Sequence, residues 1–99
     1  MPQVHWLTLQ AQPLQAQDWH DENERSLVCL YTAPGSPAVA VVLHPAGQDS
    51  LLLLQHAMAG PWRLALDSSM TQPGAPTVQD TLTVPGRSVL VLESLLPSN

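Results

Sequence analysis

The sequence predicts an all-β protein, an antiparallel β-sandwich of about seven to eight short strands. Ten prolines and five glycines break the chain at short intervals, and few stretches are long enough to hold a helix. The segments between these breaks are rich in Val and Leu, which is typical of short sandwich strands. With 99 residues, 44% of them apolar, the chain has the size of a single domain with its own core, over residues 1–99.

The first half of the chain contains two predicted strands. Residues 4–8 form the first, and residues 25–32 form the second. Between them, residues 14–19 have room for one short helical turn, and residues 20–24 are a hydrophilic loop. The segment 33–37, Ala-Pro-Gly-Ser-Pro, is a strong turn signal that ends the second strand.

The middle of the chain predicts two more strands. Residues 38–43 are almost wholly apolar, which predicts a central strand covered on both faces. Residues 45–49 form a turn, and residues 50–55 form the next strand. Its leucines, 51–54, favour helix by propensity. The short distance between turn signals favours a strand instead.

A fifth strand is predicted over residues 62–67, after a turn at 59–61. Within it, Leu64 and Leu66 alternate with Arg63 and Ala65, which is typical of a strand with one solvated face. The proline-containing and glycine-containing segment that follows, 68–77, is a predicted loop.

The last two strands are predicted to form a hairpin. Residues 81–84 and 87–93 are expected to pair across the Pro85–Gly86 turn. In the first of the two, threonine alternates with leucine and valine, which predicts one solvated face.

Charge and cysteine content exclude several classes of protein. A net charge of −5, with three Arg and no Lys, argues against nucleic acid or an anionic membrane as partner. No apolar run approaches the ~20 residues needed to cross a bilayer. The N-terminus lacks the pattern of a signal peptide, and Cys29 has no second cysteine to pair with, so we expect the cytoplasm. Flanked by apolar residues in a predicted strand, Cys29 is expected to be buried.

The sequence predicts no catalytic residue, metal site or cofactor. Paired carboxylates for glycoside hydrolysis must be held about 5 to 9 Å apart in a cleft. The acidic residues of the 18–24 stretch fit a solvated loop better, and these are Asp18, Asp21, Glu22 and Glu24. Zinc ligands occur as close pairs, whereas gaps of 15, 24 and 12 residues separate His5, His20, His44 and His56. His44 and His56 are expected in loops or at strand edges.

The tryptophans are the remaining candidates for a binding site. An exposed indole can stack on a sugar ring, whereas a buried one fills a core or a seam between domains. Core or seam is the favoured interpretation for Trp6 and Trp19. Trp62 stands beside Gly60–Pro61 at a strand entrance, and Trp62 and Trp19 are the candidates for substrate binding.

Five motifs occur in the order and at the distances found in one enzyme family. They are Val4-His5-Trp6-Leu7, Asp18-Trp19, Arg25-Ser26-Leu27, Trp62 to Ser68, and Gly86 to Leu92. This set resembles the C-terminal β-domain of bacterial glycogen-debranching enzymes and isoamylases, glycoside hydrolases of the α-amylase superfamily. One departure is His44, which ends an apolar strand where the family pattern has Asn.

The resemblance implies a non-catalytic role. Enzymes of this family hydrolyse α-1,6 branch linkages with acids that lie in a preceding barrel, so no catalytic residue is carried over to this chain. The implied partner is the catalytic barrel of the same enzyme, which the β-domain stabilises by packing an apolar face against it. Pairing of Arg87 with Asp67 is a further expectation, because the two residues occur in motifs of the same set.

Two other functions remain open at this point. The chain is a candidate α-glucan-binding module that holds glycogen or maltooligosaccharide through exposed tryptophans. It is also a candidate protein-interaction domain, for which a large exposed apolar patch would be the sign.

Overall fold

The computed structural model describes residues 2–15, 26–69 and 76–97 of the chain. All pairings between its strands are antiparallel. The elements are β1 (Gln3–Leu7), β2 (Leu27–Thr32), β3 (Pro37–His44), β4 (Ser50–Leu53), η1 (His56–Met58), β5 (Trp62–Asp67), β6 (Thr77–Val78), β7 (Thr81–Val84) and β8 (Ser88–Pro97).

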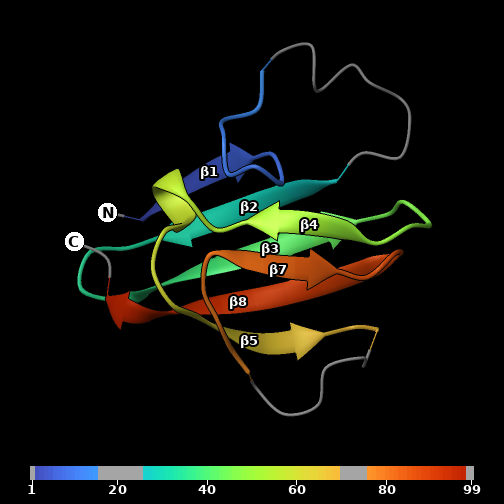
Figure 1. Cartoon of the computed structure of the whole chain (residues 1–99). Helices are drawn as coiled ribbons and strands as arrows, with labels where there is room; N and C mark the ends of the chain where they lie inside the picture. The colour runs from blue at the N-terminus through green and yellow to red at the C-terminus, as the bar shows by residue number, and fades with distance from the viewer. Residues whose placement is uncertain (1, 16–25, 70–75, 98–99) are drawn as a thin grey trace.

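The strands form two layers. Six of them form a large sheet in the order β1-β2-β3-β8-β5-β6, and β4 pairs with β7 in a small sheet. Figure 1 shows the small sheet lying across one face of the large one. This arrangement confirms the predicted all-β sandwich of short antiparallel strands, including the strand at Ser50–Leu53 that leucine content alone left ambiguous.

The predicted hairpin near the C-terminus is wrong. β7 pairs with β4, with Leu52 opposite Leu82, whereas β8 lies in the large sheet between β3 and β5. The chain therefore crosses from one layer to the other at the Pro85–Gly86 turn. The physical reason is the apolar face of β7, formed by Leu82 and Val84, which is buried only when β7 lies across the large sheet.

The core fills the space between the two sheets. The face of the large sheet that meets the small sheet is the inner face. Its buried side chains include Val28, Leu30, Ala40, Val42, Leu64, Leu90 and Leu92. The small sheet adds Leu52, Leu82 and Val84 to the same cluster. Each fully buried Leu or Val contributes about 1.5–3 kcal/mol relative to an exposed one, so this layer contact is the main source of stability.

The central strand β3 is covered on one face only, contrary to the prediction from its apolar run. Ala38, Ala40 and Val42 are buried, whereas Val39 is half-buried and Leu43 is 38% exposed. The small sheet packs on the inner face of β3, and no described element packs on the opposite one. The apolar residues on that opposite face are therefore not core residues.

A β-bulge interrupts β5. Leu64 pairs with Leu92 and Leu66 pairs with Val91, so Ala65 is an extra residue on this strand. An extra residue reverses the alternation of side chains, because successive residues point to opposite faces. Leu66 consequently lies 53% exposed on the face opposite to Leu64, and the expected alternation is wrong at this residue.

The connections differ from the sequence-based prediction in two places. The predicted 68–77 loop ends in a short strand, β6, which pairs with β5 through Thr77 and Val78. A 3₁₀ turn, η1, follows β4 and had no counterpart in the prediction. The predicted helical turn at 14–19 and the hydrophilic loop at 20–24 fall largely or wholly outside the described residues. The described residues contain no helix long and apolar enough to cross a membrane.

Candidate functional site

The uncovered side of the large sheet, here called the outer face, is apolar. Opposite residues of an antiparallel ladder share a face, so the strand register assigns each side chain to one side. The apolar residues of the outer face are Val4, Trp6, Leu27, Cys29, Tyr31, Val39, Val41, Leu43, Leu66, Val89 and Val91.

One row of the outer face runs across five strands without a polar residue. In order across the sheet it contains Trp6, Cys29, Val41, Val91 and Leu66. The bulge at β5 places Leu66 in this row, since without an extra residue Leu66 would share the side of Leu64. The row is thus a property of the register and of the bulge together.

This face departs from the usual pattern of an antiparallel sheet. Where one side is solvated, its residues are normally polar and alternate with the buried ones. Here Trp6 is 44% exposed, and Val4, Tyr31 and Leu66 are also exposed. A contiguous apolar surface of this kind is typical of a site that contacts another molecule or another domain.

An ion pair forms the polar border of the outer face. Nη2 of Arg63 on β5 donates to Oε1 of Glu93 on β8 at 2.9 Å. The two residues are opposite each other in the ladder, next to Val39 on β3. Both side chains are partly exposed, so the pair adds little to stability, but it marks where the apolar row gives way to charge.

The two tryptophans of the described residues are in different environments. Trp62 is 2% exposed, and its Nε1–H donates to the carbonyl oxygen of Met58 at 2.7 Å. It is a core residue, so its ring is not an exposed platform for a sugar. Trp6 lies exposed on the outer face and is not in the core. Trp19, the other candidate for substrate binding, is outside the described residues.

Cys29 and His44 also differ from expectation. Cys29 is half-buried on the outer face, next to Trp6, and is not a core residue. His44 ends β3 on the inner side and is 2% exposed, contrary to the expected loop or edge position. Its neighbour across the ladder is Ser88, which is also buried.

Both ring nitrogens of His44 are hydrogen-bonded within the fold. Nε2 lies 2.6 Å from the carbonyl oxygen of Gln48, which can only accept, so Nε2 carries the proton. Nδ1 therefore accepts from the hydroxyl of Ser26. The imidazole joins the start of β2 to the turn after β3. This role is structural, because the imidazole is buried and its two hydrogen bonds hold separate segments of the fold together.

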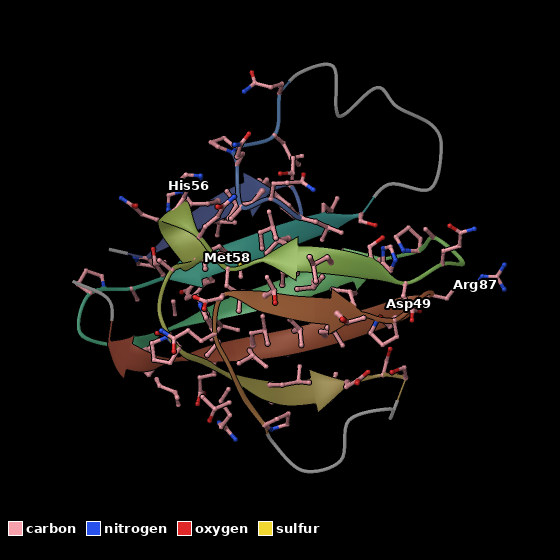
Figure 2. The ribbon with its side chains drawn as sticks, viewed as in Figure 1. Asp49, His56, Met58 and Arg87 are labelled. Carbon is pink, nitrogen blue, oxygen red and sulfur yellow. The ribbon has the colours of Figure 1, made fainter. Side chains whose placement is uncertain are left out.

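The expected pair between Arg87 and Asp67 is not formed. Oδ1 of Asp67 accepts from the backbone N–H of Ser69 at 2.9 Å and also from its hydroxyl. Arg87 projects from the turn between β7 and β8, at the end of the sandwich (Figure 2). Its backbone N–H donates to the carbonyl of Ala46 at 2.8 Å, which joins this turn to the one after β3.

The described residues bring no cluster of metal ligands together. No group of three or more His, Cys, Asp or Glu side chains in these segments could hold a metal ion. The acidic residues 18, 21, 22 and 24 and His20 lie outside the described residues.

No protein-family model matches the sequence, and no curated protein matches it either.

Proposed function

We propose that this chain is a non-catalytic accessory β-domain of a glycogen-debranching enzyme of the isoamylase type, in the cytoplasm. In this proposal the outer face packs against the catalytic barrel of the same enzyme and stabilises it. The observation that carries the proposal is the row from Trp6 to Leu66, an apolar surface across five strands with no described element over it. The ordered motifs of the sequence supply the choice of family.

The apolar character of the outer face suits a contact between domains. Interfaces between domains of one chain bury about 600–1,500 Å². Burial of apolar surface contributes about 25 cal/mol per Å², so a face of this kind is stabilised when it is covered and is costly when it is left in water. The Arg63–Glu93 pair at its border supplies polar groups where such an interface meets solvent.

The motifs of the family resemblance divide between the core and this face. Trp62, from the motif that opens β5, is buried in the core. Trp6, from the first motif, is exposed on the outer face. A tryptophan that the isolated domain leaves exposed is expected at a seam between two domains.

A matched pair of substitutions in the complete polypeptide tests the proposal. Val41→Lys places a charge in the middle of the outer face, while Thr83→Lys places the same charge on the exposed side of β7. We expect Val41→Lys to lower the melting temperature of the barrel and the rate of α-1,6 cleavage, and Thr83→Lys to change neither. Equal behaviour of the two variants, or a polypeptide without any barrel, would contradict the proposal.

The exposure of Trp6 favours α-glucan binding as a second candidate function. Trp6 and Tyr31 are both exposed aromatic residues on neighbouring strands of the outer face. Aromatic rings on a sheet can stack on glucose units. Titration with glycogen or maltooligosaccharide, followed by tryptophan fluorescence, tests this function. A shift that Trp6→Ala abolishes would support it, whereas an unchanged spectrum at millimolar sugar would remove it.

A protein-interaction domain that serves no enzyme is the remaining alternative. It would use the same outer face, and the substitution Val41→Lys would then disrupt a complex with a separate protein. The complete polypeptide would in that case contain no glucan-cleaving activity to be lost.

A further inference from the structure

A pocket lies where β2, β3 and β8 meet the turn that carries Arg87. Its volume is about 480 Å³. The lining residues are Leu27, Leu43, His44, Pro45, Arg87, Ser88 and Val89. Pockets for small molecules typically have about 300–1,000 Å³, with apolar walls and a few polar groups. This pocket has that size and composition.

The polar side chains that line the pocket already have hydrogen-bond partners within the fold, with one exception. Both ring nitrogens of His44 are bonded to Ser26 and Gln48. The hydroxyl of Ser88 donates to the carbonyl of Pro85 at 2.5 Å. For the guanidinium of Arg87, no hydrogen bond or ion pair is made with the residues that the structure describes. The group available to a ligand is therefore a cation.

The fold holds Arg87 in place at the rim. The backbone of Arg87 is in the left-handed region, with φ of 54°, and its N–H is bonded to Ala46. A Cβ added to Gly47 would lie 3.6 Å from Nη2 of Arg87, so the guanidinium rests against this glycine. The nearby carboxylate of Asp49 accepts from the N–H of Gly86 at 2.9 Å.

We propose that this pocket binds a small aliphatic carboxylate, with its hydrocarbon part against Leu27, Leu43 and Val89 and its carboxylate on Arg87. The planar guanidinium can donate two parallel hydrogen bonds to a carboxylate, which an ammonium group cannot do. Charge complementarity selects an anion, and the apolar walls select one with a hydrocarbon part. Leu27, Leu43 and Val89 belong to the outer face, so a partner that covers this end of the face would compete with the ligand. The inference does not rest on the proposed function, because the ligand is tested on the chain alone.

The test uses a set of probe molecules and the NMR spectrum of the ¹⁵N-labelled chain. Hexanoate carries both recognised groups, 1-hexanol only the hydrocarbon, acetate only the carboxylate, and hexylamine the opposite charge. We expect hexanoate to shift the amide signals of residues 43, 44 and 86–89. Its affinity should exceed that of 1-hexanol by about tenfold, the value of one exposed charge-assisted contact. It should also exceed the affinity of acetate, which lacks the hydrocarbon part, and that of hexylamine.

Two variants assign the effect to Arg87. Arg87→Gln should lower hexanoate affinity by about tenfold and leave hexanol affinity unchanged. Arg63→Gln is the matched control, because it removes the same charge at the ion pair on β5 and should leave both affinities unchanged. Should Arg87→Gln fold poorly, salt gives the same information in the unchanged chain. Hexanoate affinity should fall with ionic strength, and hexanol affinity should not.

The opposite results would overturn the proposal. Hexylamine or inorganic phosphate that bound as well as hexanoate would show that the pocket does not select an aliphatic carboxylate. Shifts centred elsewhere, or no shift at millimolar hexanoate, would show that it is not a site. If Val41→Lys abolishes the contact with the barrel but leaves hexanoate binding normal, this inference holds independently of the proposed function.

Discussion

At the scale of single residues, two glycines decide how closely the turns at the end of the sandwich approach each other. A Cβ on Gly86 would lie 2.6 Å from the carbonyl oxygen of Gly47, a distance that side-chain carbons do not reach in folded proteins. A Cβ on Gly47 would meet only the side chain of Arg87, at 3.6 Å. The same substitution should therefore have different results at these facing positions.

The prediction concerns the free energy of unfolding, measured by urea titration. Gly86→Ala forces the two turns apart and should cost about 2 kcal/mol or more. Gly47→Ala makes an ordinary contact and should change stability by less than about 0.5 kcal/mol. A loss of similar size in both variants would show that the turns are not packed as closely as described.

The buried histidine gives a second prediction at this scale. His44→Leu keeps the volume but leaves the hydroxyl of Ser26 and the carbonyl of Gln48 without their partner. Each unsatisfied group of this kind costs about 1–3 kcal/mol. Thermal or urea unfolding should show this loss, and adding Ser26→Ala to the His44→Leu variant should recover part of it. A double variant no more stable than the single one would contradict the role given to His44.

The environments of individual side chains were the least predictable from sequence. Trp6 and Leu7 are adjacent in one strand, and only the pairing register decides that Leu7 faces the core and Trp6 faces out. The burial of His44 depends on Ser26 and Gln48, which lie 18 and four residues away along the chain. No local pattern in the sequence signals either contact.

At the scale of elements, the bulge in β5 is an extra residue without a partner. Leu64 and Leu66 already pair with Leu92 and Val91, so removal of Ala65 leaves a regular ladder. Deletion of Ala65 should keep the β-sheet circular dichroism spectrum and cost no more than about 1 kcal/mol. Deletion of Ala40 from β3 is the control, since it reverses the facing of side chains in a central strand and should unfold the chain.

Strand positions were predictable because prolines, glycines and polar clusters mark their ends. The predicted strand at 62–67 agrees with β5 residue for residue. Strand partners were not predictable, because a Pro-Gly turn can join strands of one sheet or carry the chain between two sheets.

The number of covered faces was also not predictable from the apolar run at 38–43. It fits a strand covered on two sides, and equally one with a core on one side and an exposed apolar face on the other.

At the scale of the whole molecule, the outer face should govern association of the isolated chain. Apolar surface that is uncovered in the monomer favours contact between copies as concentration rises. The double substitution Trp6→Thr and Leu66→Thr removes the two ends of the apolar row and keeps residues suited to strands. Sedimentation velocity should show oligomers for the unchanged chain and about half as much association, or less, for this variant.

Leu51→Thr is the control for association. Leu51 is exposed on β4, in the small sheet, so its replacement removes apolar surface away from the outer face. It should leave the sedimentation profile unchanged. An equal reduction by Leu51→Thr would show that association follows general hydrophobicity and does not depend on one face.

The place of β8 in the large sheet has a consequence for synthesis of the protein. Of the described strands it is the last to be made, yet it lies between β3 and β5 and pairs with both. A nascent chain on the ribosome therefore holds two separate half-sheets until β8 emerges from the exit tunnel. Folding of the sandwich must await the synthesis of β8, and premature termination anywhere before residue 88 leaves the halves unjoined.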